Sequence, residues 1–531
     1  MTGNIIFQLH CHLPFVRHPE HEYFLEEDWL FEAVADCYLP LLDVLEHLKA
    51  DNVPASITMG ITPPLATMLT DELLQTRTAR YLALRQELAE KDAQQRGPHD
   101  PFRRASDFSV ERTRWLRRWY DDLGRDLCRA FKRHWDDGRI ELITCNATHG
   151  MFPLLNDERA IRAQLWHAVR THERIFDREP KGIWLAECAV WPGIASLLAE
   201  FDLRFTFVET HALLMADPPA AAGCYAPIYG DRGVAFFARD PGCARQVWSA
   251  DEGYPGDPAY REFYRDLGWD LPYEMVKPYI QATGDRKNTG LKYHRVTGKV
   301  DLGHKQPYDP EVAHGRAREH GWHFARRRVL AAREVNRLIG QEPCVVAPFD
   351  AELFGHWWFE GPVFLEHALR ALATLEGAPR PVTPPQYLRA NPTQQVAEPA
   401  VSSWGEGGYF KVWCQGANDW LWRPVLQAKD HFAQHMDGSA ALADGWPGRV
   451  ARQAARELLL AQSSDWPFIL ATNTQTGYGT KRPITHLARF WRLMDLWKKR
   501  GQGLTPEELH DLEQMEARDN IFEDVNTGVF A

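Results

Sequence analysis

Short, almost continuous apolar runs recur along the first 350 residues and again near residue 470. A strand that is covered on both faces is apolar throughout, whereas a half-exposed strand alternates, so these runs predict buried strands of a parallel sheet. We expect strands at 5–9, 57–61, 140–145, 183–185, 205–208, 344–349 and 468–471. Stretches with helical periodicity, such as 158–175 and 316–339, lie between them. This alternation indicates an α/β fold, either a barrel or a doubly wound sheet.

Two stretches interrupt the alternation. Residues 70–135 are polar, charged and helical in period, which predicts a helical insertion between two strands, with helices at 71–91 and 108–133. Residues 376–399 are rich in Pro and Ala and predict a linker. The chain beyond this linker is almost wholly helical, with helices expected at 419–435, 449–462, 485–499 and 505–517. We therefore expect an α/β domain over 1–395, which includes the insertion, and an all-helical C-terminal domain over 396–531.

Length, charge and cysteine usage exclude several classes of protein. A chain of 531 residues is long enough to bury a large core. The net charge of −11 argues against a nucleic-acid partner, and no run of 18 apolar residues indicates a membrane span. The N-terminus shows no signal-peptide pattern. The nine cysteines are odd in number and form no CxxC pair, which favours a reducing, cytoplasmic location. Separately, we expect the protein to be a monomer.

Residues that carry chemistry gather where the predicted strands end. The first strand runs into His10 and His12, the strand at 140–145 is followed by His149, and two further strands end near Glu187 and Asp350. In α/β barrels the catalytic groups lie at the carboxyl ends of strands. A single polar residue at such a position is usually a structural group, but four strand ends of this kind predict one shared site.

Glu187 and Asp350 both lie among apolar neighbours, in Trp184-Leu-Ala-Glu-Cys-Ala189 and in Ala347-Pro-Phe-Asp-Ala-Glu-Leu-Phe-Gly-His-Trp-Trp358. Burial raises the pKa of a carboxyl group that lacks compensating charges or donors. Two carboxyls facing one cleft are the minimal machinery for glycoside cleavage, because one attacks the anomeric carbon and the other protonates the leaving oxygen. The alternative is a pair of buried, ion-paired structural acids.

Tryptophan is abundant, with 20 in the chain. Indole rings stack on the apolar faces of sugars, so tryptophans in polar, glycine-bearing loops favour a carbohydrate ligand. Those in or near such loops are Trp29, Trp184, Trp269, Trp357, Trp358, Trp404, Trp413, Trp420 and Trp422. Two alternatives remain: many of these rings fill the core or a domain interface, or the protein binds glucan without catalysis.

A second chemistry uses some of the same residues. His10, His12 and His149 are suitable ligands for a divalent metal, with Glu187 or Asp350 as fourth ligand or base. A metal-dependent carbohydrate deacetylase would contain these parts on a similar barrel. An HxH pair is a weak pattern, however, because neutral histidine also binds sugar hydroxyls.

The motifs together resemble glycoside hydrolase family 57, and within it the 1,4-α-glucan branching enzymes. Five segments occur in the family's order: His10-Cys-His-Leu-Pro-Phe-Val-Arg-His-Pro-Glu20, Ala147-Thr-His-Gly150, the segment around Glu187, the segment around Asp350, and Ser402-Ser-Trp-Gly-Glu-Gly-Gly408 with Trp413. The resemblance covers nearly the whole chain. It implies a (β/α)₇ barrel, a helical insertion, a C-terminal helical domain that closes the cleft, and neither metal nor cofactor.

The resemblance also implies roles for individual residues. Glu187 would be the nucleophile and Asp350 the general acid/base of a retaining mechanism that cleaves α-1,4-glucan (amylose, starch or glycogen) and forms α-1,6 branches. The residues implied to bind substrate are His10, His12, Trp29, His149, Arg265, Trp269, Trp404, Trp413 and Asp465.

One departure from the family's pattern concerns the shielding of the reaction from water. Branching members carry a mobile loop with a tyrosine at its tip, whereas residues 230–233, Gly-Asp-Arg-Gly, predict a tight turn directly after Tyr229. Tyr229 is the candidate for the tip tyrosine. A short loop would admit water and shift the outcome toward hydrolysis, so an amylase-like α-1,4-glucan hydrolase is the alternative within the family.

Overall fold

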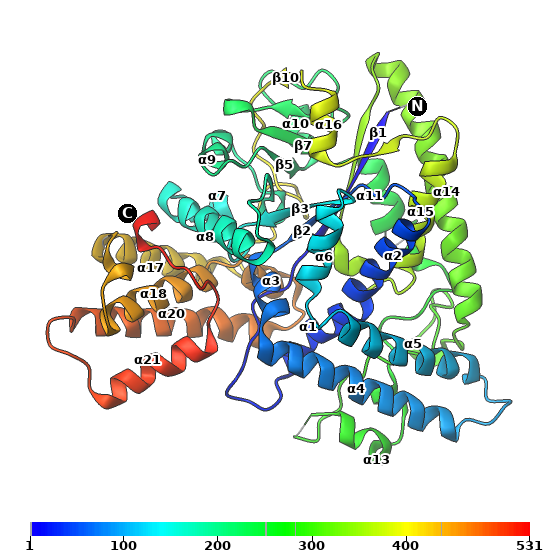
Figure 1. Ribbon diagram of the computed structural model, residues 1–531, viewed down its shortest axis with the longest axis horizontal. Helices are drawn as coiled ribbons and strands as arrows, with labels where there is room; N and C mark the ends of the chain where they lie inside the picture. Colours follow the sequence, from blue (N-terminus) through cyan, green and yellow to red (C-terminus); the bar gives the residue numbers. More distant parts are fainter. Residues whose placement is uncertain (1–2, 250–251, 282, 437, 531) are drawn as a thin grey trace.

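The computed structural model describes residues 3–249, 252–281, 283–436 and 438–530. Its centre is one curled sheet with the strand order β10-β6-β7-β5-β4-β3-β2-β1-β8, and β9 pairs with β1 beside this path (Figure 1). Seven neighbouring strands run parallel: β8 (Cys344–Asp350), β1 (Asn4–Cys11), β2 (Ile57–Ile61), β3 (Ile140–Cys145), β4 (Gly182–Trp184), β5 (Phe205–Val208) and β7 (Ala235–Ala238). They form the predicted (β/α)₇ arrangement.

The seven strands are buried along almost their whole length, as their continuous apolar runs predict. Their two outer members, β7 and β8, are joined by a hydrogen bond of 2.8 Å from the Asp240 amide to the Val346 carbonyl. Parallel register places the carboxyl ends of the strands at one rim. His10 is the register partner of Asp350 across β1 and β8, so residues 340 positions apart in the chain lie side by side.

Helices cover the sheet and connect its strands. Those between parallel strands include α1 (Asp28–Ala33), α2 (Leu39–Ala50), α3 (Pro63–Thr70), α8 (Glu158–Phe176), α9 (Ile194–Glu200), α14 (Pro310–Ile339) and α15 (Gly361–Thr374). Three helices occupy the stretch predicted as an insertion: α4 (Glu72–Gln95), α5 (Arg103–Asp122) and α6 (Leu127–Asp136). The single helix expected at 108–133 is thus two helices, because Asp126 caps a new helix through the Arg129 amide.

The C-terminal part is helical, with α17 (Trp422–His435), α18 (Trp446–Ala461), α19 (Asp465–Thr472), α20 (Thr476–Lys498) and α21 (Pro506–Arg518). These helices lie beside the sheet on the side away from α14 (Figure 1). Thr505 begins α21 with a capping box to Glu508. The region contacts the strand-end rim directly, since the Ser464 amide donates to the His149 carbonyl at 3.0 Å.

Two expectations about secondary structure are wrong. Residues 468–471 lie in α19, not in a strand, because a short apolar run has no periodicity that separates a buried strand from a buried helix. The stretch 376–399 is also not a plain linker. It contains β9 (Arg380–Pro381), α16 (Pro384–Ala390) and β10 (Gln395–Val396), and β9 and β10 add to the sheet beside β1 and β6 (Ile228–Tyr229).

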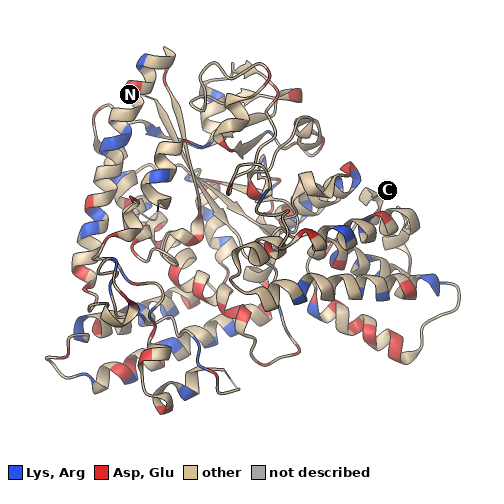
Figure 2. Cartoon of the chain, turned by 180° about the vertical axis from the view of Figure 1, so that it is seen from behind, with Lys and Arg blue, Asp and Glu red and all other residues tan. Residues whose placement is uncertain are grey.

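The surface carries both signs of charge. Lys and Arg are interspersed with Asp and Glu along the helices of the described chain (Figure 2). Among the described residues, no helix combines the length and the apolar character needed to cross a membrane. All nine cysteines are free thiols, and only Cys414 is exposed.

Candidate active site

Glu187 lies on a strained turn just past the end of β4. Residues Ala186–Cys188 form a 3₁₀ turn in which Glu187 has φ 63° and ψ 21°, and Cys188 also has a positive φ of 51°. A left-handed conformation in a residue other than glycine costs of order 1–3 kcal/mol and is concentrated at functional sites. Here it aims a carboxylate that is only 7% exposed into the rim.

Three donors hold the Glu187 carboxylate. Trp404 Nε1 donates to Oε2 at 2.6 Å, while Trp413 Nε1 and Ser464 Oγ reach Oε1 at 3.1 and 2.7 Å. Burial raises the pKa of Glu187, and the bonds from Ser464 and Trp404 oppose that shift by stabilising the ionised form. Segments 217 to 277 residues away in the chain thus supply the donors.

Asp350 ends β8 in a different environment. Within the described part of the chain, no hydrogen-bond donor contacts its carboxyl group. Burial raises its pKa well above the usual range, and the negative charges of Glu352 and Glu187 raise it further. These surroundings favour the protonated form of Asp350, whereas the three hydrogen bonds to its neighbour Glu187 favour the carboxylate form of that residue. The two acids therefore differ in the way that acid and nucleophile of a glycosidase must differ.

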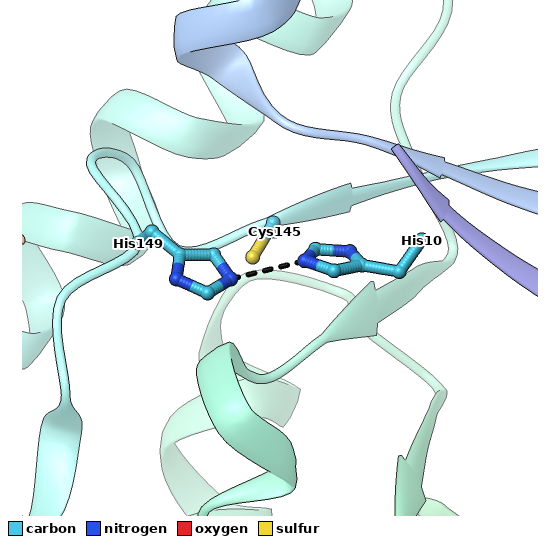
Figure 3. Close-up of side chains that lie close together, drawn as sticks. All are labelled: His10, Cys145 and His149. Atoms are coloured by element: carbon cyan, nitrogen blue, oxygen red, sulfur yellow. Dashed lines mark hydrogen bonds between the residues drawn. The ribbon is translucent and has the colours of Figure 1, made fainter. Parts of the chain in front are cut away.

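The three predicted histidines lie together at the same rim. His10 Nε2 and His149 Nε2 are 3.0 Å apart beside Cys145, as Figure 3 shows, and the rings of His12 and His149 stack with centroids 3.8 Å apart. His12 Nε2 contacts Asp465 Oδ1 at 3.0 Å. Asp465 raises the pKa of His12 against the effect of burial, while burial lowers the pKa of His10 and His149 well below the usual range.

Metal-ligating groups occur here only as small sets. Among the described residues, the sets close enough to share an ion are His10 with Cys145 and His149, His12 with His149 and Asp465, and Glu457 with His486 and Asp519. The members of the first two sets already contact one another, as in the His12–Asp465 pair. Neither Glu187 nor Asp350 belongs to any of these sets. The described residues therefore do not form the predicted deacetylase ligand set, in which one of these acids joins the three histidines.

The predicted aromatic platforms divide into buried and exposed rings. Trp404 is partly buried beside Glu187, but Trp413 is only 1% exposed, so it holds the carboxylate and presents no free face to a sugar. Trp29, on α1, lies edge-on to Tyr478 of α20 with ring centroids 5.6 Å apart. Trp269 is 57% exposed and donates to Asn288.

Arg265 lies in the same segment as Trp269, outside the catalytic cluster. Its guanidinium contacts the Asp270 carboxylate at 3.1 Å and the Leu302 carbonyl at 2.7 Å. In the described residues, neither Arg265 nor Trp269 contacts Glu187 or Asp350. The predicted substrate-binding set therefore contains a compact core around the two acids and an outlying pair.

Tyr229 is not part of this site. It belongs to β6, which pairs antiparallel with β7, and its register partner is Ala235, the first residue of β7. Ala235 in turn is level with Phe205 at the start of β5, so Tyr229 lies at the amino ends of the strands, close to Tyr387 of α16. Glu187 is at the opposite, carboxyl end. The prediction that Tyr229 forms the tip of a shielding loop is wrong.

Several site residues escaped the sequence analysis. The Ser464 hydroxyl lies 2.7 Å from both Glu187 Oε1 and His149 Nδ1. Nothing in the local sequence distinguishes this serine from others in a helical region. Glu352 accepts from the Tyr38 hydroxyl at 2.5 Å and from the His12 amide at 3.2 Å, and burial raises its pKa to about 7. Glu352 lies two residues from Asp350. Its contacts join the loop after Asp350 to Tyr38 and to the end of β1, and so stabilise the rim.

A pocket of about 380 Å³ opens beside Trp404. Its lining includes Glu209, His211, Arg239 and Tyr409. Arg239 and Glu209 are paired at 2.9 Å, and the guanidinium lies 5.3 Å from the centre of the Trp404 ring. An aromatic ring flanked by a carboxylate and a guanidinium offers both stacking and hydrogen-bonding groups to a sugar ring.

A parallel barrel whose strand ends carry two carboxyl groups with different pKa-determining surroundings is typical of enzymes that act on glycosidic bonds. Comparison with known proteins specifies the family. Residues 6–308 match glycosyl hydrolase family 57, and residues 425–530 match the C-terminal domain of 1,4-alpha-glucan branching enzymes. The chain belongs to glycosyl hydrolase family 57. This membership leaves the deacetylase hypothesis without support.

Relatives with two different activities resemble the chain. A 1,4-alpha-glucan branching enzyme of Thermococcus kodakarensis is 32% identical over the whole chain and 79% of its own length. The α-amylase AmyC of Thermotoga maritima is 38% identical with a TM-score of 0.91, covering 100% of this chain and 99% of AmyC. A branching enzyme of Pyrococcus horikoshii is 32% identical with a TM-score of 0.88, covering 100% and 97%.

Proposed function

We propose that this protein is a retaining α-glucan transferase that cleaves α-1,4-glucan and forms α-1,6 branches, with Glu187 as nucleophile and Asp350 as general acid/base. The observation that carries the proposal is the contrast between the two acids. Three hydrogen bonds favour the carboxylate form of Glu187, whereas burial and the acidic neighbours of Asp350 favour its protonated form.

The reaction follows from these protonation states. Asp350 donates its proton to the glycosidic oxygen as the bond from that oxygen to the anomeric carbon breaks, and the Glu187 carboxylate bonds to the same carbon from the opposite face. The released chain leaves with a free 4-hydroxyl. Asp350, now ionised, then removes the proton of a glucan 6-hydroxyl, whose oxygen displaces Glu187 and forms the α-1,6 bond.

The remaining rim residues bind and orient the substrate in this proposal. The sugar that is attacked lies among His10, His12, His149 and Asp465. The hydrogen bonds between these side chains hold them in the orientation in which they contact its hydroxyl groups. Trp404 and the pocket beside it receive a neighbouring glucose unit. Trp29, Trp269 and Arg265 extend the path for longer chains. Trp413 is assigned to the support of Glu187.

The substrate class and setting follow from the same proposal. The partner is an α-glucan polysaccharide, and α-1,6 branching belongs to glycogen biosynthesis. A neutral polymer requires no basic surface, in agreement with the net charge of −11. The nine free cysteines support a cytoplasmic location, and a monomer remains the expected state.

Hydrolysis is the second candidate function, and a specific observation favours it. The β6–β7 hairpin is closed by the tight turn at Asp231–Gly233, and Tyr229 lies at the far end of the strands. The family's shielding tyrosine therefore has no counterpart in this hairpin. Water that reaches the Glu187 intermediate in place of a 6-hydroxyl would release free glucan, the activity named for the similar AmyC.

The product formed from amylose distinguishes the two functions. Incubation with purified protein should create α-1,6 linkages, measured by proton NMR and by isoamylase release of side chains, with few new reducing ends. Equal numbers of reducing ends and cleaved bonds, with no α-1,6 signal, would establish the hydrolase instead. The Glu187→Gln variant, assayed in parallel, controls for contaminating amylases.

Removing the Ser464 hydroxyl is expected to weaken catalysis and to change its pH dependence. The Ser464→Ala variant loses a 2.7 Å hydrogen bond to the Glu187 carboxylate, and a bond to a charged group contributes about 1.5–3 kcal/mol. The pKa of Glu187 should rise, so the acidic limb of the kcat/KM profile should move up by about one pH unit or more. An unchanged acidic limb would contradict the role assigned to Ser464.

The control for this variant is Ser196→Ala. Ser196 lies on α9 and its hydroxyl donates to Asp231, away from both acids. The control should keep the wild-type profile, which shows that losing a serine hydroxyl elsewhere has no such effect.

A further inference from the structure

A buried cluster of arginines lies apart from the two acids, between the insertion and the barrel. Arg85 from α4, Arg112 from α5 and Arg261 from the segment before α14 converge on the single carboxylate of Asp36. Their closest nitrogen atoms are 3.1, 3.9 and 3.7 Å from its oxygens. Asp36 itself lies in a π-helix, Val34–Tyr38, and is 2% exposed.

The guanidinium groups of this cluster outnumber the carboxylates that they contact within 4 Å. Asp36 is the one carboxylate of the described residues that pairs with Arg85, Arg112 and Arg261. Lys292, which lines the same cavity, lies 3.6 Å from Asp266, and the buried Glu360 and Glu32 carry further negative charge nearby. Three like charges held around one carboxylate in a water-poor interior are costly for a folded protein.

Unused hydrogen-bond donors point to what is missing. Arg85 Nε and Nη1, Arg112 Nε and Arg261 Nε are buried and have no partner among the described residues. Arg85 and Arg261 are only 4% and 8% exposed, so water outside the protein does not reach most of their surface. Burial and the repulsion from Arg85 and Arg261 lower the pKa of Arg112 to about 10 despite the attraction of Asp36.

The arginines line a cavity of about 10 Å³, whose wall is completed by Phe359 and Tyr308. The guanidinium groups of Arg112 and Arg261 lie 4.4 and 3.7 Å from the centre of the Phe359 ring. A space of this size holds one water-sized occupant and excludes a tetrahedral oxyanion. The cavity thus combines unpaired donors, three guanidinium groups that share one carboxylate, and room for a single small species.

We propose that Arg85, Arg112 and Arg261 bind a buried monovalent anion of halide size, with chloride as the occupant. The anion supplies a second negative charge between the three guanidinium groups, beside Asp36, and accepts from the unused guanidinium nitrogens. It joins α4 and α5 of the insertion to the segment around Arg261, and so fixes the insertion on the barrel.

The π-helix that carries Asp36 also contacts the loop at the catalytic rim. The residues after Asp36 in the π-helix contact the loop that follows Asp350: Cys37 Sγ donates to the Ala351 carbonyl at 3.0 Å, and the Tyr38 hydroxyl donates to Glu352. The Asp36 carbonyl lies against Gly355, where a Cβ would be 1.7 Å from its oxygen. The anion therefore supports the packing on which the rim loop rests.

Anomalous diffraction from wild-type crystals grown or soaked in sodium bromide tests the site directly. Bromide is a halide with a usable absorption edge, and a peak is expected among Arg85, Arg112 and Arg261. The absence of a peak there overturns the proposal and leaves water as the occupant. This measurement needs no variant and is independent of whether the enzyme branches or hydrolyses glucan.

Thermal unfolding provides the second test. The Tm of the wild-type protein in sodium chloride should exceed the Tm in sodium gluconate of equal ionic strength by a few degrees. Arg112→Gln removes one of the three guanidinium groups that hold the anion and should abolish that difference. Arg104→Gln, an exposed position on the same helix paired with Asp309, should retain it. An equal chloride effect in wild type and Arg112→Gln would overturn the proposal, because it would be a general salt effect.

Discussion

Replacing Glu187 by glutamine is expected to abolish glucan cleavage and transfer while leaving amylose bound. Glutamine has the size of glutamate and keeps an acceptor oxygen for Trp404 or Ser464, but an amide does not attack the anomeric carbon. Loss of a covalent nucleophile costs about 10⁴- to 10⁶-fold in kcat. Turnover of amylose and its affinity by calorimetry measure the two effects separately. Activity within tenfold of wild type would remove Glu187 from the mechanism.

Azide distinguishes a lost nucleophile from a damaged site. Glu187→Ala opens space on the face from which the carboxylate attacks. Azide that enters there should form a bond to the anomeric carbon of maltoheptaose while Asp350 protonates the leaving oxygen. The expected product is a β-glucosyl azide, identified by mass and by its anomeric NMR coupling. Glu179→Gln, on the exposed turn before β4, is the control and should retain wild-type activity without azide.

The parallel strands explain why so much of the site was predictable from the sequence. A run of apolar residues marks each strand, and parallel register brings every carboxyl end to one rim. His10, Glu187 and Asp350 could therefore be assigned to one place from their positions after strands, and in the structure His10 is the register partner of Asp350. The helical periodicity of 158–175 and 316–339 was equally informative, because long amphipathic segments have few alternatives.

The residues that escaped prediction depend on contacts between distant segments. Ser464 reaches Glu187 only because the C-terminal helices lie against the end of β3, and no local pattern reports that packing. Tyr229 was misplaced for a related reason. Its neighbours predict a turn correctly, but whether a turn lies at the amino or carboxyl end of a sheet depends on strand direction, and β6 runs antiparallel to β7. Residues 468–471 were too short a run to separate helix from strand.

Replacing Asp350 by asparagine is expected to reduce activity and raise stability together. Asparagine cannot protonate a leaving glycosidic oxygen, and loss of general acid catalysis costs about 10²- to 10⁴-fold. A substrate with a good leaving group, such as an α-maltosyl fluoride, does not need that proton. The variant should therefore retain much more of its activity on the fluoride than on amylose, whereas Glu187→Gln should lose both.

The stability effect follows from the raised pKa of Asp350. The unfolded chain releases the proton above about pH 3.9, whereas the folded protein keeps it, because burial and the charges of Glu352 and Glu187 disfavour ionisation. The wild-type free energy of unfolding therefore falls as pH rises above that value, by at most about 1.4 kcal/mol for each pH unit until the folded carboxyl ionises. Asparagine carries no such penalty.

Thermal unfolding from pH 4 to pH 8 measures this difference. The Tm of Asp350→Asn minus that of wild type should be near zero at the acidic end and should grow as the pH rises. Asp419→Asn, at an exposed position, should follow the wild-type curve throughout. A difference that is constant with pH would mean that Asp350 has the same pKa in the folded and unfolded states. It would then lack the property that suits it to donate a proton at neutral pH.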